Sequence, residues 1–340
     1  MPRALSLFLT IAAIPIGHFI ATTPAARAHT GSAMQVVAQA PQPLTSAGRH
    51  LLVEAVAADV KQYYFDKQVA QTVANALLAH EQAGDYNAVT DEVFANLLAR
   101  HLIEASGDPH FTVEYTPKAF PDFSKPPPPE SRVRYRAAME QVNCTFQTVA
   151  VRANNVGYMK LNSFPDIAAC QSKAESALAE LNHADALILD LRDNRGGYAN
   201  MVIFLASYLF DHPEYMFDPR VPVTKQSWTC SPVAGSLLAH KPVYILTSSR
   251  TYSAAEQFSY DLKMLRRATL VGETTGGANH AGVLHNLADH FAVGIPEHKP
   301  VNPYSDKDWA LTGVAPDVRV KAADALATAE KLAESRLRRR

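Results

Sequence analysis

The sequence predicts an α/β fold, in which an amino-terminal three-helix bundle precedes a larger main domain. Two patterns predict it. From residue 133 onward, short continuous apolar runs alternate with helical segments, which is typical of a sheet covered by helices on both faces. Before that point, three amphipathic stripes indicate three short helices. A chain of 340 residues is long enough to bury one large core and a smaller one.

The chain begins with the pattern of an export signal. Arg3 supplies a positive charge, an apolar run follows, and a small-x-small motif ends at Ala28. This pattern predicts a signal peptide over residues 1–28. Pro15 and His18 interrupt the apolar run, which weakens it as a membrane-spanning helix. We therefore expect a soluble, exported protein, either periplasmic or secreted, that does not span the membrane.

A helical bundle with a first extended segment is expected over residues 45–116, after a flexible leader at 29–44 that is rich in Ala, Gln and Pro. Apolar side chains recur at helical spacing in three stripes, and Thr90 is the expected N-cap of the third helix. The stripes are Leu52, Val56, Val60 and Tyr63, then Val69, Val73 and Leu77, then Phe94, Leu97, Leu98 and Leu102. Three such helices bury their stripes against one another.

A proline-rich segment, residues 117–132, separates the bundle from the main domain at 133–340. It contains four consecutive prolines, which favour polyproline II and exclude a helix or a central strand. We interpret it as a linker, with an ordered lid as the alternative. In the main domain, strands are expected at 145–152, 156–164, 184–191, 242–248 and 268–273, and helices at 172–181, 199–210, 253–265 and 322–337. Further strands are expected between 290 and 320.

Composition excludes several classes of function. Lys and Arg number 32 against 33 Asp and Glu, and the net charge of -1 gives no electrostatic reason to expect nucleic acid. The basic end "RLRRR" is interpreted as a solvated helix end. Walker-type and dinucleotide-binding glycine patterns are absent from the sequence, so no cofactor is expected.

Neither the cysteines nor the closely spaced histidines predict a metal site. The cysteines are Cys144, Cys170 and Cys230. Their spacing fits no zinc pattern and is compatible with free thiols or with one disulfide. Three histidines recur every five residues, at His280, His285 and His290. Neither a helix nor a strand places that spacing on one face, so we expect scattered surface histidines.

Two segments that could carry chemistry each follow an apolar strand. The first is residues 190–197, which ends in Gly196-Gly197 just before a helix. Paired glycines permit a positive φ and let another group approach their amides closely. Amides near a helix start are unpaired and suit a developing negative charge. The alternative is a tight turn that is braced by an Asp–Arg pair.

The second segment begins a helix at Ser253. An oxygen there gains from the positive end of the helix dipole when it develops charge, and the Ala254 amide points to the same place. Gly196 or Gly197 could join Ala254 in an oxyanion hole, where losing one donor typically raises the barrier by roughly 3 to 4 kcal/mol. Taken alone, Ser253 is better explained as a simple N-cap.

Three long motifs together resemble the tail-specific, or C-terminal processing, serine peptidase family (S41). They are residues 188–210, 243–279 and 302–318. They are most similar to the branch that includes tricorn protease and interphotoreceptor retinoid-binding protein, whose amino-terminal bundle the segment from residue 45 to "GDPHFTV" also resembles. The resemblance covers almost all of the mature chain. It implies a ClpP/crotonase-like main domain and hydrolysis of peptide bonds by a serine nucleophile.

The family's motifs map onto particular residues. The Ser-x-x-Glu pattern implies Ser253 as the nucleophile and Glu256 as a supporting residue. Ala278 stands where tail-specific enzymes have a lysine base, so a serine–lysine dyad is absent. The tricorn branch uses an upstream histidine, which maps to His110, and neutral imidazole accepts a hydroxyl proton near pH 7. Asp108 is judged too close to His110 in sequence to orient its ring.

One position departs from the branch. A glutamate commonly follows the tryptophan in the segment that ends "GV-x-PD", and here Ala310 stands in its place. Asp306 or Asp308 is the expected replacement; otherwise the enzyme is slow or inactive. No recognisable PDZ module interrupts the sequence.

The sequence thus predicts an exported, cofactor-independent serine endopeptidase that acts on peptides or unfolded proteins. The alternative is a non-catalytic module that binds an apolar ligand, such as a lipid or a retinoid. Retention of Ser253, His110 and Gly196-Gly197 favours the enzyme, and Ala310 favours the binding module. The oligomeric state stays open.

Overall fold

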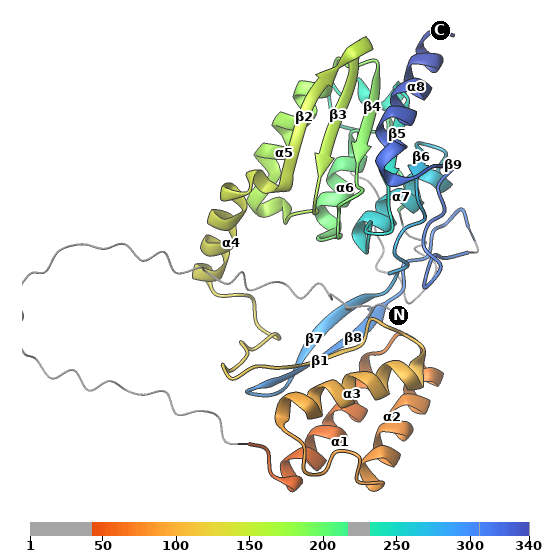
Figure 1. Cartoon of the computed structure of the whole chain (residues 1–340). Coiled ribbons are helices and arrows are strands. Elements are labelled where there is room, and N and C mark those ends of the chain that lie inside the picture. Colours follow the sequence, from red (N-terminus) through yellow and green to blue (C-terminus); the bar gives the residue numbers. More distant parts are fainter. Residues whose placement is uncertain (1–42, 217–231, 306, 340) are drawn as a thin grey trace, which may run out of the picture. The chain divides into compact units, whose positions relative to one another are not determined.

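The structure is a computed structural model that describes residues 43–216, 232–305 and 307–339 (Figure 1). The predicted signal peptide, most of the predicted leader, Cys230 and Asp306 lie outside the described residues.

Three helices form the amino-terminal bundle, as predicted. They are α1 (Ser46–Tyr63), α2 (Lys67–Gln82) and α3 (Asp91–Ser106). Thr90 caps α3, since its side chain accepts a hydrogen bond from the Val93 amide. Most of the apolar stripes are buried between the helices, with Val56, Val73 and Leu98 fully enclosed. Amphipathic spacing and side-chain capping thus account for this part of the fold.

A small antiparallel sheet packs on this bundle. Its strands are β1 (Thr112–Tyr115), β7 (Ala281–Ala288) and β8 (Phe291–His298), in the order β1-β8-β7. Phe291, Val293 and Ile295 of β8 belong to the same hydrophobic cluster as Phe94 and Leu98 of α3. A hairpin that the sequence analysis placed in the main domain therefore shares its core with the bundle, and Figure 1 shows the blue hairpin against the orange helices.

The main domain is an α/β fold around a six-stranded sheet. In order across the sheet its strands are β2 (Phe146–Arg152), β3 (Val156–Leu161), β4 (Ala186–Asp190), β5 (Val243–Thr247), β6 (Thr269–Gly272) and β9 (Val318–Arg319). β2 pairs with β3 in antiparallel fashion, and the other neighbours are parallel. This is the ClpP/crotonase-like arrangement that was expected.

Helices cover both faces of this sheet. On one face lie α5 (Ile167–Leu181), α6 (Ala199–Ser207) and α7 (Ala254–Met264); on the other lies α8 (Ala325–Leu337). Alternate residues of β4 serve the two cores: Leu187 and Leu189 face the first, Ala186 and Ile188 the second. This burial on both faces explains why the central strands read as continuous apolar runs. Short 3₁₀ turns complete the chain at Asn143–Thr145, Ala153–Asn155, Leu238–His240 and Ala322–Asp324.

A helix that the sequence analysis missed, α4 (Pro129–Gln141), begins within the proline-rich segment and runs across the predicted boundary at residue 133. The prediction that no residue of the proline run is helical is wrong for its last member, because Pro129 occupies the first helical position, where its missing N–H costs nothing. Before α4, the chain is tied to the β7–β8 hairpin. The Phe120 amide donates to the Asp289 carbonyl at 2.6 Å, and the Phe123 amide donates to Asn286 Oδ1 at 2.7 Å.

Cys144 and Cys170 form a disulfide that joins the turn before β2 to α5.

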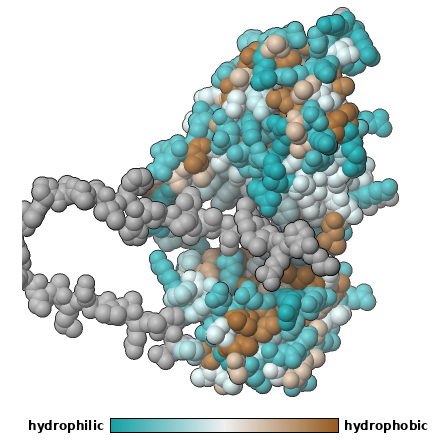
Figure 2. Space-filling model, in the orientation of Figure 1, coloured by the Kyte–Doolittle hydropathy of each residue, from teal (hydrophilic) through white to brown (hydrophobic). Residues whose placement is uncertain are grey.

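The expectation of surface histidines is wrong for His280 and His285, whose side chains are only 11% and 19% exposed. Among the helices that the structure describes, none has both the length and the apolar character needed to cross a membrane. On the face shown in Figure 2, apolar residues of the main domain are interspersed with hydrophilic ones.

Candidate active site

The turn after β4 is braced by a buried ion pair. Asp190 is fully buried and accepts two hydrogen bonds from the Arg192 guanidinium, at 2.9 and 2.6 Å, and one from the Tyr158 hydroxyl at 2.7 Å. Burial alone would raise the pKa of Asp190, but these donors outweigh it and hold the pKa below its usual value. Asp190 and Arg192 therefore act as the structural pair that was the alternative for this segment.

Hydrogen bonds join this turn to the one that follows β5. The Thr251 hydroxyl donates to the Leu191 carbonyl at 2.8 Å, and the Tyr252 amide donates to the Asn194 carbonyl at 3.0 Å. The parallel pairing of β4 with β5 brings both strand ends to the same edge of the sheet. The segments that the sequence singled out are thus held together as one unit.

Gly196 lies directly against Ser253. A Cβ atom at Gly196 would be 2.8 Å from Ser253 Cβ and 2.9 Å from the Ala254 nitrogen, closer than side chains tolerate. The φ of Gly196 is also positive, at 96°. Glycine is needed here because the two turns approach so closely.

Ser253 is exposed and has an unusual backbone conformation. It stands at the N-cap of α7 with φ 54° and ψ -124°, and it forms a capping box with Glu256, whose carboxylate accepts from the Ser253 amide. Positive φ is uncommon for a residue with a side chain and costs free energy. A serine on such a sharp strand-to-helix turn presents its hydroxyl outward. The interpretation of Ser253 as the N-cap of α7 is therefore confirmed, and its strained backbone is a feature that a simple N-cap does not require.

Two backbone amides in these turns are unpaired within the described residues. The Gly196 amide already donates to Asn194 Oδ1 at 2.8 Å, so it is not a free donor. In the described part of the chain, the Gly197 and Ala254 amides donate no hydrogen bond. Unpaired amides near a helix start are the donors that an oxyanion requires. The arrangement leaves Gly197 and Ala254, and not Gly196, for that role.

Glu256 stabilises the serine turn through hydrogen bonds. Its fully buried carboxylate accepts hydrogen bonds from the Ser253 amide (2.9 Å), the Thr275 hydroxyl (2.5 Å), the Gly277 amide (2.6 Å) and the Ala278 amide (2.8 Å). Burial raises the pKa of Glu256, and these donors offset only part of that rise. The carboxylate joins the strained Ser253 backbone to the glycine-rich segment after β6.

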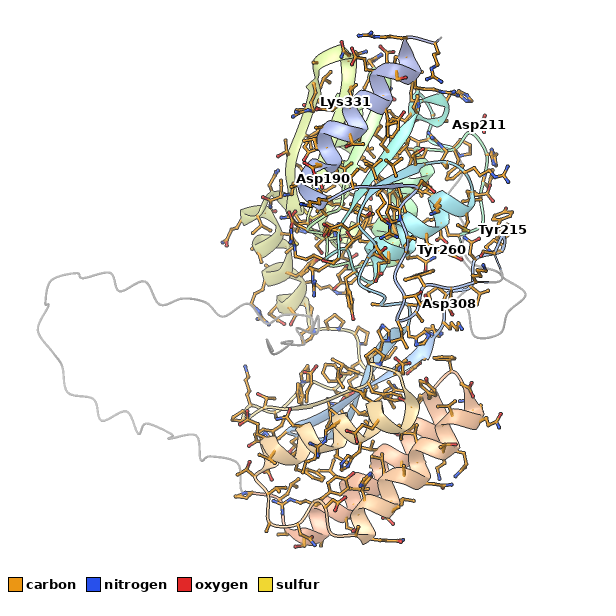
Figure 3. The ribbon with its side chains drawn as sticks, turned by 45° about the vertical axis from the view of Figure 1, so that its right-hand side comes forward. Asp190, Asp211, Tyr215, Tyr260, Asp308 and Lys331 are labelled. Carbon is orange, nitrogen blue, oxygen red and sulfur yellow. A yellow bond between two sulfur atoms is a disulfide. The ribbon has the colours of Figure 1, made fainter. Side chains whose placement is uncertain are left out.

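The positions that depart from the family motifs are also well packed. Ala278 is buried and places no amine near Ser253; its carbonyl accepts from Trp309 Nε1 at 3.0 Å. Asp308, in the segment between β8 and β9 (Figure 3), binds Lys299 at 2.6 Å and accepts from the Ala310 amide at 2.9 Å. Asp308 is therefore engaged by a lysine and has no described contact with His110.

The carboxylate that does contact His110 is Asp108. His110 Nδ1 lies 2.6 Å from Asp108 Oδ1, and His280 Nδ1 lies 2.6 Å from the other oxygen. Tyr64 adds a hydroxyl at 3.1 Å. Burial alone would raise the pKa of Asp108, but the two imidazoles outweigh it and hold the pKa well below its usual value. Asp108 is thus an ionised carboxylate shared by two histidines.

This shared carboxylate determines the tautomer of both rings. An ionised carboxylate only accepts hydrogen bonds, so Nδ1 carries the proton in His110 and in His280. In each neutral ring, Nε2 then carries the lone pair. Both Nε2 atoms are buried and have no hydrogen-bond partner among the described residues.

The charge of Asp108 acts on Tyr252, the residue before Ser253. Burial is the main cause of the raised pKa of Tyr252, which precedes Ser253, and the charges of Glu256 and Asp108 add to it. Within the described residues no hydrogen bond joins His110 to Ser253. Catalytic hydrogen bonds are often unformed until the substrate binds.

Two protein-family models match this chain. Residues 155–320 match the model of peptidase family S41, and residues 43–149 match the N-terminal domain of peptidase S41 in eukaryotic IRBP, the retinoid-binding protein named above. The chain belongs to the S41 peptidase family.

Relatives of this S41 chain include curated processing proteases. It is 30% identical over 165 residues to the carboxyl-terminal-processing protease of Synechocystis sp.. The aligned residues cover 48% of this chain and 37% of that protein. It is 32% identical over 173 residues to the chloroplastic carboxyl-terminal-processing peptidase 3 of Arabidopsis thaliana, covering 49% of this chain and 32% of that protein. The chain therefore matches about a third of the length of each.

Solved structures share the fold. The photosystem II D1 C-terminal processing protease gives a TM-score of 0.51 at 16% identity, covering 82% of this chain and 94% of that chain. A putative peptidase from Parabacteroides merdae gives 0.57 at 16% identity, covering 84% and 96%. Tricorn protease gives 0.51 at 14% identity, covering 86% of this chain and 37% of that chain.

Two residues beside the proposed base of this S41 chain were missed from the sequence. The judgement that Asp108 is too close to orient His110 is wrong, because an Asx turn bends the chain back. The His110 amide donates to Asp108 Oδ1 at 3.0 Å, which brings the ring onto the same carboxylate. An aspartate directly before a proline favours such a turn and was a usable signal. His280 had no local signal, because it is 172 residues away from Asp108.

A buried carboxyl group on α7 should make the stability of the S41 chain pH-dependent. Asp261 accepts from Gln257 Nε2 and Asn302 Nδ2, and burial raises its pKa to about 8. Between the unfolded pKa of about 4 and the folded pKa of about 8, the folded state binds more protons, so this group lowers stability as pH rises.

We expect Asp261→Asn to remove this pH dependence. The difference in free energy of unfolding between the variant and the unmodified chain should grow in favour of the variant by up to about 1.4 kcal/mol for each pH unit between pH 5 and pH 7. Urea unfolding at several pH values measures the difference, with the exposed Asp289→Asn as the control. A difference that stays constant with pH would contradict the prediction.

Proposed function

We propose that this chain is an exported serine endopeptidase with Ser253 as nucleophile and His110 as general base. The observation that carries the proposal is the position of Ser253: it is exposed, and it stands at the start of α7 on a strained turn packed against Gly196. A protein maintains backbone strain of this kind chiefly at functional sites.

The chemistry follows from the groups at the site. Ser253 Oγ attacks the peptide carbonyl carbon while His110 Nε2 takes the hydroxyl proton. The carbonyl oxygen becomes an oxyanion that the Gly197 and Ala254 amides can bind. When the C–N bond breaks, the imidazolium gives its proton to the leaving amine. Water, deprotonated by the same imidazole, then releases the acyl group and restores Ser253.

Asp108 would take the part of the missing glutamate. An acid beside the base holds the imidazole in one tautomer and stabilises the imidazolium. Asp108 has the required contact, 2.6 Å from His110 Nδ1, although it comes from the turn before β1 and not from the position of Ala310. The sequence argument for a non-catalytic, apolar-ligand binding module rested on Ala310, and Asp108 removes most of its force.

Export and substrate class belong to the same proposal. The amino-terminal signal pattern predicts export, and the Cys144–Cys170 disulfide supports it because disulfides persist in oxidising compartments. The curated relatives are carboxyl-terminal-processing proteases. We therefore propose a peptide or an unfolded protein segment as the substrate, bound without a cofactor.

The test is cleavage of a mixed peptide library by the full chain in the presence of EDTA, read by mass spectrometry. Ser253→Ala should lower cleavage by at least about 10³-fold. Ser249→Ala, an exposed serine on the same turn, should cleave normally. Equal cleavage by Ser253→Ala would remove the nucleophile assignment. A library left intact by the unmodified chain would favour the binding module.

A further inference from the structure

Asp108, His110 and His280 place three metal-binding side chains at one point. One nitrogen or oxygen atom from each lies within 4.8 Å of the others. Asp108 and His110 come from the turn between α3 and β1, and His280 comes from the residue before β7. The pairing of β8 with both β1 and β7 brings these distant segments together.

The cluster is enclosed and incompletely satisfied. The side chains of Asp108, His110 and His280 are 4%, 10% and 11% exposed. Aromatic rings surround them, with the Phe65 ring centroid 4.6 Å from that of His280. Buried polar atoms nearly always have a partner, yet both Nε2 atoms have none among the described residues. Nδ1 of each ring faces Asp108, so two imidazoles and one ionised carboxylate form an enclosed ligand set of the kind that a divalent cation binds.

We propose that Asp108, His110 and His280 bind Zn²⁺ or another divalent ion that prefers imidazole ligands. Imidazole and carboxylate are ligands that zinc takes, and three protein ligands leave its fourth position open. The ion takes Nδ1 of each imidazole and one oxygen of Asp108, the atoms that lie together at this point, and the proton of each ring moves from Nδ1 to Nε2.

The bound ion would switch off the peptidase, a consequence that rests on the proposed function. A neutral imidazole has one lone pair and one N–H. When Nδ1 of His110 binds the ion, Nε2 carries the ring proton and has no lone pair for the Ser253 proton. Removal of the ion returns the lone pair. Zinc binding at this site would thus inhibit the peptidase by occupying its general base.

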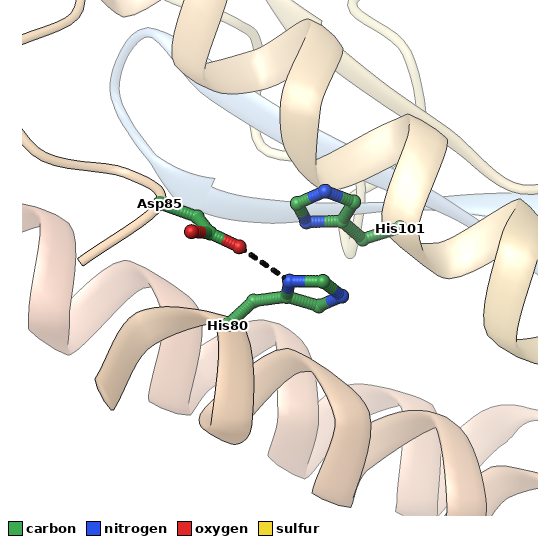
Figure 4. Close-up of side chains that lie close together, drawn as sticks. All are labelled: His80, Asp85 and His101. Carbon is green, nitrogen blue, oxygen red and sulfur yellow. Dashed lines mark hydrogen bonds and ion pairs between the residues drawn. The ribbon is translucent and has the colours of Figure 1, made fainter. Parts of the chain in front are cut away.

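A second trio on the bundle offers a matched control. His80, Asp85 and His101 also lie close together (Figure 4), with His80 Nδ1 2.6 Å from Asp85. The two imidazoles are stacked, however, 3.7 Å apart and only 13° from parallel. Their lone pairs lie in nearly parallel planes and do not meet on one ion. The Tyr86 hydroxyl also occupies His101 Nδ1, at 2.9 Å.

The test is a ZnCl₂ titration of the EDTA-treated, desalted full chain against a chromophoric chelator. The unmodified chain should bind one ion tightly. His280→Asn, whose amide can still donate to Asp108, should weaken that binding at least about 100-fold, whereas His80→Asn should leave it unchanged. Thermal unfolding without zinc shows whether each variant is folded. If a variant does not fold, visible d–d absorption of Co²⁺ in the unmodified chain decides between imidazole ligation and none.

The outcomes separate the two proposals. Absence of tight zinc binding by the unmodified chain, or loss in His80→Asn and not in His280→Asn, overturns the metal site. If zinc binds, and if peptide cleavage is blocked by zinc and restored by EDTA, both the metal site and the inhibition are supported. If zinc binds without any effect on cleavage, only the inhibition is overturned. If no peptide is cleaved, the proposed function fails, and the titration still decides the site.

Discussion

Replacement of Glu256 by alanine is expected to destabilise the folded chain by about 4 kcal/mol and to abolish peptide cleavage. Four donors converge on this buried carboxylate: the Ser253, Gly277 and Ala278 amides and the Thr275 hydroxyl. Alanine leaves all four without a partner in a site that excludes water. The Ser253 backbone, which needs an external bond to hold its positive φ, should relax.

Urea unfolding at pH 7, with the peptide-library assay beside it, measures both effects. Glu256→Gln is the informative companion, because one amide oxygen still accepts while the amide nitrogen faces donors. It should lose less stability than Glu256→Ala. A loss below about 1 kcal/mol in Glu256→Ala would show that the network contributes little.

Gly197→Ala is expected to have the second large effect. A Cβ atom there would lie 2.1 Å from the Phe164 carbonyl oxygen, and the φ of Gly197 is 136°. The collision is with backbone, so the turn itself must move, away from the position that it holds beside Ser253. Overpacking and backbone strain together should cost about 3 kcal/mol or more, and cleavage should fall with the displaced amide.

Gly235→Ala is the matched control for this substitution. Gly235 also has a positive φ, at 79°, but nothing lies within 4 Å of its added Cβ. It should lose only the roughly 1 to 2 kcal/mol of backbone strain and retain normal cleavage. Thermal and urea unfolding of both variants compare the two. Equal losses would mean that the contact with Phe164 is not what makes Gly197 necessary.

Local patterns were sufficient for most of the fold. The Thr90 cap, the helical stripes of the bundle and the apolar strands such as Ala186–Asp190 all depend on residues near one another in sequence. They were predicted because spacing and capping act over a few residues. The missed helix α4 shows the limit, since its polar sequence buries no residue and leaves no apolar stripe to read.

Long-range pairing decided what local patterns did not contain. The β7–β8 hairpin packs with the bundle because β8 pairs with β1, which a linear division of the chain into domains could not foresee. The same pairing carries His280 to Asp108. The assignment of Cys144 to Cys170 likewise needed the contact between α5 and the turn before β2.

The sequence by itself determined the α/β class, the bundle, the family motifs and the serine at the start of α7, because each is written in neighbouring residues. Only the tertiary structure decided the hydrogen-bond partners of the residues proposed for the active site. It showed that the Gly196 amide is already bound by Asn194, that Asp308 is held by Lys299, and that Asp108 is shared by two histidines. A hydrogen-bond partner is chosen by proximity after folding, and proximity between distant segments is a property of the packed chain.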